Sequence, residues 1–374
     1  MSTFEVRVYP VEIHPHGNAD SLEIAQIQGY KSIVGKGQYR DGDLVAYIPE
    51  DAVVPEDVLR EMNLHGKLAG SAKNRVKAIR LRGVISQGIC YPAKPEWEEG
   101  QVVTEQLGIT KYEPPIPTNL GGAVWNAGGR RCLRYRIENL QKYPKQLVPG
   151  EQVVITEKIH GTFVQFGIMP EELEHKTYGR LVVASKGLGS QGLAFIPTTE
   201  GAGHFPGAVK QEKNLYLRAA DALLIYPRAM AYKPLATYVA GGNPVHIMGE
   251  IFGQGVQDLH YGANVGIRSK LGFRVFDIHL GGPNGRYLND DELDIWVAGL
   301  KLSRVPMLFR GPYDPAWTRG IAQGKETISG NQMHIREGVI VRPTVERYND
   351  KVGRVQFKIK SDAYLLRKGG TEHS

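Results

Sequence analysis

The 374-residue chain has few of the features that mark membrane, secreted or zinc-binding proteins. It has only two cysteines, Cys90 and Cys132, which form no CxxC pair, so zinc ribbons and fingers are excluded and a metal would need oxygen or histidine ligands. No apolar run is long enough to span a bilayer, and the first residues, MSTFEVRVYP, lack the basic and apolar regions of a signal peptide. We therefore expect a cytoplasmic, disulfide-free protein that makes no membrane contact.

Acidic residues are in the minority, with 39 against 46 basic residues and a net charge of +7. This balance is compatible with a polyanionic partner. The basic residues gather in three segments in which they alternate with apolar residues, and a period of two places them on one face of a strand. The segments are RVKAIRLR at 75–82, GGRRCLRYR at 128–136 and FKIKSDAYLLRK at 357–368.

The first hundred residues form short apolar runs separated by Gly, Asn and Asp turns, which is typical of a small β-barrel. Residues 14–55, from HPHGNADSLEIAQIQ to PEDAVVP, resemble the OB-fold domains that bind tRNA. The resemblance implies a five-stranded barrel that offers a basic strand face and its loops to an oligonucleotide. An OB fold that serves only as a structural cap is the alternative.

The length of the chain predicts two or three domains. The Pro-, Gly- and Asn-rich segment at 113–129 reads as a linker, so we expect an OB domain over 1–120 and a second domain over 121–374. The second domain mixes strands and helices, which gives an α+β protein. Strands are predicted at 162–168, 179–185, 246–252, 272–280, 336–343 and 353–361, helices at 216–232 and 290–302, and a helical piece around 137–144.

The segment EKIHGT at 157–162 places a lysine directly after an apolar alternation and before a His-Gly-Thr turn. A lone KxxG pattern arises by chance in long chains, so its meaning depends on the segments farther along the chain. These are ASKGLG at 184–189, MGEIFG at 248–253, FRVFDI at 273–278, REGVIVRP at 336–343 and FKIKS at 357–361, each at a predicted strand end.

In this order the segments resemble, motif by motif, the covalent nucleotidyltransferases, which comprise RNA ligases, ATP-dependent DNA ligases and mRNA capping enzymes. The match runs from about residue 130 to the end of the chain. With the N-terminal OB domain, the chain most resembles the RNA ligases that seal nicks in duplex RNA. The resemblance implies an adenylyltransferase domain of antiparallel sheets flanked by helices.

The resemblance also assigns roles to residues. It makes Lys158 the nucleophile that forms a lysyl-adenylate with ATP, and Lys186 a contact to phosphate or to the 3′ end of a strand. It places Glu250 on a ribose hydroxyl and Glu337 beside the metal and the nucleophile. By the same register Phe273 stacks on adenine.

A lysine nucleophile must lose its proton, so desolvation or nearby positive charge has to lower its pKa. A divalent Mg²⁺ or Mn²⁺ ion would supply that charge. So would Lys358 and Lys360, whose spacing puts both ammonium groups on one face of a strand, toward the phosphates. Gly161 allows the backbone to come close to the nucleotide.

Three positions remain open at this stage. Glu157 either accepts a hydrogen bond from the adenine amino group or simply flanks the strand. His160 either positions phosphate or metal, or is an ordinary turn histidine. Phe276 has the opposite strand parity to Phe273 and is expected in the core, although the two could be exchanged.

The favoured function is an ATP-dependent RNA ligase that joins 3′-hydroxyl and 5′-phosphate ends through lysyl-AMP and AMP-capped RNA. Its expected partners are ATP and a nicked duplex or structured RNA such as tRNA, and we expect a monomer. DNA ligases and capping enzymes place an OB domain after the last motif, where we expect none. The alternatives are a DNA-strand ligase, a capping-type guanylyltransferase, or a non-catalytic tRNA-binding or RNA-binding protein with a degenerate nucleotidyltransferase domain.

Overall fold

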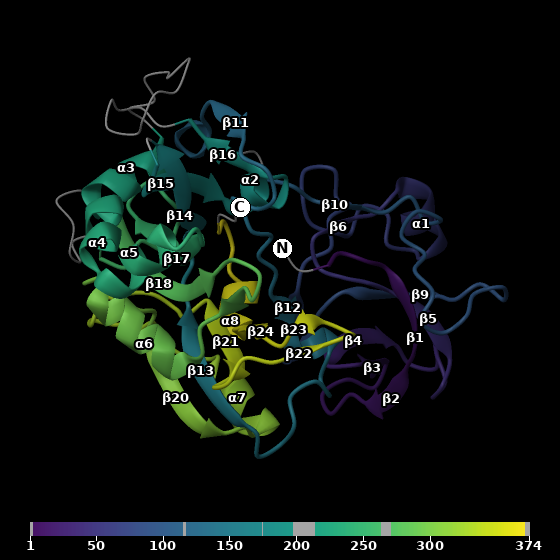
Figure 1. Cartoon of the computed structure of the whole chain (residues 1–374). Coiled ribbons are helices and arrows are strands. Elements are labelled where there is room, and N and C mark those ends of the chain that lie inside the picture. Colours follow the sequence, from purple (N-terminus) through teal and green to yellow (C-terminus); the bar gives the residue numbers. More distant parts are fainter. Residues whose placement is uncertain (1–2, 115–116, 174, 197–213, 263–270, 371–374) are drawn as a thin grey trace.

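The computed structural model describes residues 3–114, 117–173, 175–196, 214–262 and 271–370. The purple and blue strands in Figure 1 form an N-terminal lobe, residues 3–114, and the teal to yellow elements form a C-terminal lobe from residue 117 onward. The protein is a sheet-rich α+β molecule with few helices, as the sequence predicts. No helix of the described ranges has both the length and the apolar character needed to cross a membrane.

The N-terminal lobe is built of short antiparallel strands. One sheet has the order β1-β5-β9 and another the order β2-β3-β4, while β6 pairs with β10 and β7 with β8. Among the described residues the pairing does not close these sheets into one ring, so the closed five-stranded barrel predicted from the sequence is not observed. The elements are β1 (Arg7–Pro10), β2 (Glu12–Pro15), β3 (Leu22–Ile27), β4 (Tyr30–Gly35), β5 (Leu44–Ile48), β6 (Ala52–Val53), α1 (Glu56–Glu61), β7 (Ile79–Leu81), β8 (Val84–Ser86), β9 (Ile89–Pro92) and β10 (Thr110–Lys111).

The basic segment at 75–82 differs from its prediction as a continuous strand with one basic face. Only Ile79–Leu81 is strand, because Arg82 and Gly83 adopt positive φ angles of 46° and 91° and turn the chain back into β8. Arg75 points inward and forms an ion pair with Asp51. The exposed bases of the segment are Lys77, Arg80 and Arg82, around the β7–β8 hairpin.

The C-terminal lobe contains two five-stranded sheets. The first sheet has the order β12-β24-β21-β13-β20 and the second the order β15-β14-β17-β18-β19, with all neighbours antiparallel except β12 and β24. The first comprises β12 (Glu138–Asn139), β13 (Gln152–Lys158), β20 (Met307–Pro312), β21 (Gly338–Pro343) and β24 (Phe357–Lys360). The second comprises β14 (Thr162–Leu173), β15 (Lys176–Ser185), β17 (Val245–Gly253), β18 (Leu271–Leu280) and β19 (Arg286–Tyr287).

Helices cover the second sheet and bury its apolar face. The predicted helices are confirmed as α3 (Leu215–Ala222) with α4 (Ile225–Ala231), and as α6 (Asp290–Gly299). The helical piece predicted around 137–144 is only a 3₁₀ turn, η2 (Leu140–Lys142), which the Asn139 side chain caps at the Gln141 amide. The remaining elements are η1 (Thr118–Leu120), β11 (Val124–Asn126), α2 (Lys186–Ser190), β16 (Leu193–Phe195), α5 (Lys233–Ala240), α7 (Pro315–Ile321), β22 (Tyr348–Asn349), β23 (Gly353–Arg354) and α8 (Asp362–Leu365).

The two lobes are joined by a close backbone contact. The Gly29 amide donates to the Gln141 carbonyl at 2.8 Å, and the Gln141 side chain donates back to the Gly29 carbonyl at 3.1 Å. A Cβ atom on residue 29 would lie 2.6 Å from Gln141 Cα, so this approach requires glycine. Lys142 adds an ion pair to Glu5 at 3.2 Å. The N-terminal lobe therefore has a defined place against the first sheet.

Candidate active site

The segment EKIHGT links the two sheets of the C-terminal lobe. Lys158 is the last residue of β13 in the first sheet, and Thr162 is the first residue of β14 in the second. The turn between them crosses from one sheet to the other beside β17, and a Cβ atom on residue 161 would lie 2.1 Å from the Ile251 carbonyl oxygen. Gly161 is therefore needed for this crossing, which exposes Lys158 at the junction of the sheets.

A cavity of about 350 Å³ lies at this junction, between the two lobes. It brings together all of the site residues predicted from the sequence except Phe273. These are Glu157, Lys158, His160, Gly161, Lys186, Glu250, Glu337, Lys358 and Lys360. Residues that are up to 203 positions apart in the chain thus share one cavity.

Glu337 is the nearest carboxylate to the expected nucleophile. Its Oε1 atom lies 2.7 Å from Lys158 Nζ, and its side chain is only 4% exposed. The second oxygen, Oε2, is buried and has no hydrogen-bond partner within the described ranges. Gly338 lets β24 approach closely here, since a Cβ atom at that position would lie 2.0 Å from the Ile359 carbonyl oxygen. One oxygen of Glu337 therefore holds the lysine and the other is available to a ligand.

Several lysines gather at another part of the cavity wall. Burial, together with the charges of Lys360, Lys186 and Lys158, lowers the pKa of Lys358 to about 7. Burial also lowers the pKa of Lys186, the first residue of α2, and the charges of Lys158 and Lys111 act in the same direction. An anion bound among these ammonium groups would relieve their mutual repulsion. This part of the cavity is suited to a polyphosphate.

The two remaining acids lie in different surroundings. Glu250, on β17, has its pKa raised to about 7 by burial, against an opposing effect of the Lys158 charge. Glu157 precedes Lys158 on β13, and its Oε2 accepts hydrogen bonds from the Thr327 amide at 3.0 Å and hydroxyl at 2.6 Å. Its Oε1 is buried without a hydrogen-bond partner in the part of the chain that the structure covers, and burial raises the pKa of the carboxyl.

The structure reverses the predicted places of two phenylalanines. Phe273 is 3% exposed and packs in the core of the second sheet, 5.5 Å from the Phe166 ring, while Phe276 lines the cavity. Regular alternation puts the two rings on opposite faces of β18, and Phe273 shares the helix-covered face with Leu271 and Val275. A β-bulge follows Val275, which pairs with Gly249 while Asp277 pairs with Met248, so Phe276 is an extra residue on β18. The prediction of Phe273 as the adenine-stacking residue is therefore wrong in its placement, because the face of β18 that carries Phe273 is the core face.

Other side chains hold both ring nitrogens of His160, unlike those of an ordinary turn histidine. Its ring is buried, with Nε2 at 2.8 Å from Asp258 Oδ1 and Nδ1 at 3.0 Å from the Tyr364 hydroxyl. Its amide donates to the Tyr261 hydroxyl at 2.8 Å. Nδ1 also lies 3.9 Å from Glu337 Oε2. The ring is therefore held from both nitrogens, close to the Lys158–Glu337 pair.

Several residues of the cavity wall were missed by the sequence analysis. From the N-terminal lobe come Tyr30 and Tyr47, whose rings stack at 5.0 Å, and Lys111. No motif marks these residues, since they reach the cavity only through the docking of the lobes. From the C-terminal lobe come Asp277 and Arg342, which stand inside the motif segments FRVFDI and REGVIVRP.

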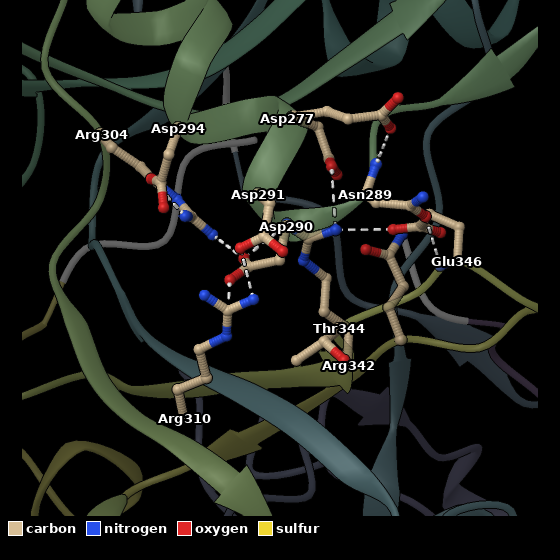
Figure 2. A network of polar contacts seen from close by, with 12 residues as sticks. Asp277, Asn289, Asp290, Asp291, Asp294, Arg304, Arg310, Arg342, Thr344 and Glu346 are labelled. Carbon is tan, nitrogen blue, oxygen red and sulfur yellow. Dashed lines mark hydrogen bonds and ion pairs between the residues drawn. The ribbon is translucent and has the colours of Figure 1, made fainter.

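A buried ionic network extends from the cavity residues Asp277 and Arg342 and connects the two sheets. Figure 2 shows Arg304, Arg310 and Arg342 pointing toward Asp290, the first residue of α6, and Asp290 is fully buried. Arg342 also binds Glu346 at 2.6 Å and lies 3.9 Å from Asp277. The network therefore fixes the relative position of β18 and β21, which carry cavity residues.

The donor set fits a metal that is shared with a substrate rather than held by the protein alone. Over the described residues, no group of three or more His, Cys, Asp or Glu side chains has the arrangement of a metal site. Magnesium commonly binds to one or two carboxylates together with substrate phosphates and water. Glu337 Oε2, buried beside the lysine cluster, provides one such carboxylate oxygen.

Comparison with known families decides the classification. The RNA ligase family model matches residues 151–360, which is more than half of the chain. The chain belongs to the RNA ligase family. An OB-fold domain model matches residues 7–93, so the predicted OB domain at the N-terminus of this RNA ligase family member is confirmed. No curated protein matches the chain.

Solved structures of one RNA ligase share the fold along nearly the whole chain. An apo variant of the Naegleria gruberi RNA ligase has a TM-score of 0.73 at 23% identity and covers 98% of each chain. The same ligase with PPi has a TM-score of 0.72 at 23% identity, over 97% of this chain and 98% of that one. A variant of the same ligase with ATP and Mn has a TM-score of 0.70 at 22% identity, and the match covers 96% of this chain and 98% of that one.

Proposed function

We propose that the protein is an ATP-dependent RNA ligase that joins 3′-hydroxyl and 5′-phosphate ends at nicks in duplex RNA. The observation that carries the proposal is the Lys158–Glu337 pair at 2.7 Å, which faces a cavity lined by Lys186, Lys358 and Lys360. In this proposal an OB domain over 1–120 binds the RNA, and an adenylyltransferase domain over 121–374 carries out the chemistry.

In the first step the Lys158 amine attacks the α-phosphorus of ATP. A nitrogen–phosphorus bond forms, the bond to the leaving pyrophosphate breaks, and the product is lysyl-AMP. Glu337 is placed to orient the amine and to take its proton. The AMP then passes to the 5′-phosphate of the RNA, and the 3′-hydroxyl attacks that phosphate and releases AMP.

The cavity offers a place for each part of ATP. The lysines at 186, 358 and 360 face the phosphates, and Glu250 accepts from a ribose hydroxyl. Phe276 takes the stacking role first assigned to Phe273, in a contact worth about 1–3 kcal/mol. Glu157 has one oxygen left to accept from the adenine amino group. The Naegleria gruberi RNA ligase has been solved with ATP and Mn and with AMP and Mn, which supports the same ligands here.

Magnesium or manganese is the expected metal, and Glu337 Oε2 is the oxygen that would hold it. A bound divalent ion would neutralise phosphate charge and favour the unprotonated amine. The protein's own contribution is to hold the carboxylate in place through the close approach of β21 and β24.

The RNA is expected along the N-terminal lobe. Its exposed bases Lys77, Arg80 and Arg82 surround the β7–β8 hairpin, and Arg80 lies 4.0 Å from Asp362 at the start of α8. A-form duplexes are recognised through phosphates, shape and 2′-hydroxyls, and phosphate contacts weaken with salt. Sealing of a nicked RNA duplex should therefore be more sensitive to salt than the formation of lysyl-AMP.

The decisive experiment is label transfer from α-labelled ATP with a divalent metal. We expect a covalent protein–AMP adduct that Lys158→Ala abolishes and that the exposed-lysine control Lys176→Ala retains. Adduct in the Lys158→Ala variant would place the nucleophile elsewhere. Label from GTP instead of ATP would favour a capping-type enzyme, sealing of DNA nicks alone a DNA ligase, and no adduct a non-catalytic binding protein.

A further inference from the structure

The last helix of the described chain is fixed to the segment that carries Glu337, directly before β21. Helix α8 begins at Asp362, two residues after Lys360, and its N-cap, Ser361, donates its amide to the Glu337 carbonyl at 2.8 Å. The Ser361 hydroxyl donates to the Arg336 carbonyl at 2.6 Å and accepts from the Tyr364 amide at 3.1 Å. The start of the helix therefore has one defined position relative to the active site.

From this position α8 contacts the turn between Lys158 and Thr162 through a closed ring of four side chains. The Tyr364 hydroxyl lies 3.0 Å from His160 Nδ1, and His160 Nε2 lies 2.8 Å from Asp258 Oδ1. Asp258 Oδ2 accepts from Arg367 Nε at 3.3 Å, and the Arg367 guanidinium stacks 3.5 Å above the Tyr364 ring. Three separate parts of the chain, at residues 160, 258 and 364–367, meet in this ring.

The ring fixes the orientation of the imidazole. Both nitrogens are satisfied when Nε2–H donates to Asp258 and Nδ1 accepts from the Tyr364 hydroxyl. His160 is 4% exposed and Tyr364 is 2% exposed, so water has little access with which to replace either bond. A side chain held on both sides in a buried place has a single orientation, and so does the backbone turn that carries it.

We propose that Tyr364 and Arg367 are positioning residues for the nucleophile, acting through His160. His160 is two residues after Lys158, in the same turn between the sheets, so the ring sets where the Lys158 amine points. Attack on phosphorus requires a near-linear approach at close range, and a displacement of about 1 Å can cost about a hundredfold in rate. The inference rests on the proposed reaction and adds the C-terminal segment at 361–367 to its machinery.

The test is a double-mutant cycle between Tyr364→Phe and His160→Ala, measured on the single-turnover rate of lysyl-AMP formation. Tyr364→Phe removes only the hydroxyl, and we expect the rate to fall about tenfold or more at saturating ATP, with the KM for ATP unchanged. Because Tyr364 acts through His160, adding Tyr364→Phe to His160→Ala should cause no further loss. Arg367→Met should lower the rate in the same way.

The control is Tyr238→Phe, which removes a hydroxyl bonded at 2.7 Å to the Gly281 carbonyl, away from the cavity. It should leave the rate unchanged. A Tyr364→Phe variant as fast as the wild type, or losses that multiply in the double variant, would overturn the inference.

The same cycle run on the free energy of unfolding separates this inference from the proposed function, since it needs no activity. A wild type that forms no adduct but shows coupling between positions 160 and 364 would overturn the reaction and leave the ring in place. Absence of coupling in unfolding would overturn the ring itself.

Discussion

Lys158 Nζ lies 2.7 Å from Glu337 Oε1, and the two side chains differ sharply in exposure, at 24% for the lysine and 4% for the glutamate. The amine can therefore meet a substrate in the cavity while the carboxylate stays fixed behind it. This relationship joins the ends of β13 and β21, which pair directly as Lys158 and Gly338. The proposed nucleophile and its carboxylate partner are thus placed by backbone hydrogen bonding between neighbouring strands.

Replacement of Glu337 by glutamine tests this pair. Glu337→Gln keeps the shape of the side chain but loses its charge, so it can neither accept the lysine proton nor hold a cation well. We expect lysyl-AMP formation to fall about a hundredfold or more, in the range of general-base catalysis. The melting temperature should not fall, because Lys158 keeps partial access to water. Near-normal adduct formation in this variant would remove Glu337 from the mechanism.

The two phenylalanines of β18 should respond in opposite ways to truncation. Phe273→Ala opens a cavity in a closely packed core and should lower the free energy of unfolding by about 3–5 kcal/mol, measured by urea denaturation. Phe276→Ala should mainly raise the KM for ATP, about tenfold or more, because it removes a stacking surface from the cavity. A larger effect of Phe273→Ala than of Phe276→Ala on the KM of the folded protein would contradict the exchange.

The buried ionic network makes a prediction about stability. Asp290→Ala leaves Arg304 and Arg342 buried without their shared partner, so we expect the free energy of unfolding to fall by about 3–5 kcal/mol. Asp291→Ala is the matched control, because Asp291 is 73% exposed and its ion pair with Arg310 lies at the surface. That change should cost less than about 1 kcal/mol. Equal effects in the two variants would show that the network does not support the sheets.

Glu250 should make stability depend on pH. Burial raises its pKa from 4.5 to about 7, so the folded protein binds this proton more tightly than the unfolded chain. The resulting stabilisation is present below pH 4.5 and is lost as the pH rises through 7, by up to about 3 kcal/mol. Urea denaturation should show that, between pH 5 and pH 8, the free energy of unfolding of the wild type falls relative to that of Glu250→Gln. Parallel curves for the two proteins would place Glu250 in a more polar environment.

A single added methyl group should disturb the contact between the lobes. Gly29→Ala forces a methyl group to within 2.6 Å of Gln141 Cα, which must move the lobes apart. Because the N-terminal lobe supplies Tyr30 and Lys111 to the cavity wall, we expect slower lysyl-AMP formation and a higher KM for ATP. Gly17→Ala is the control, since no atom lies within 4 Å of a Cβ there. If both variants charge as fast as the wild type, the docking does not affect the nucleotide.

Sequence patterns were sufficient where a residue's position follows from its own segment. The helical spacing at 290–302 predicted α6, and the order of the motifs, through the family resemblance, singled out residues that line the cavity around Lys158. Patterns failed where the position depends on contacts between distant segments. Lys111 reaches the cavity through the docking of the lobes, and Arg75 turns toward Asp51 and the Tyr112 ring, which it contacts.

The bulge at Phe276 has a consequence for comparing this chain with its relatives. Up to Val275 the odd-numbered residues of β18 face the helices, whereas from Ile278 onward the even-numbered residues do. The single added residue therefore changes which positions of the strand face the core. An alignment that threads this strand without a one-residue shift will exchange core and ligand positions on one side of it. The Naegleria gruberi RNA ligase is 23% identical to this chain, so an alignment of the two has few shared residues with which to fix the place of that gap.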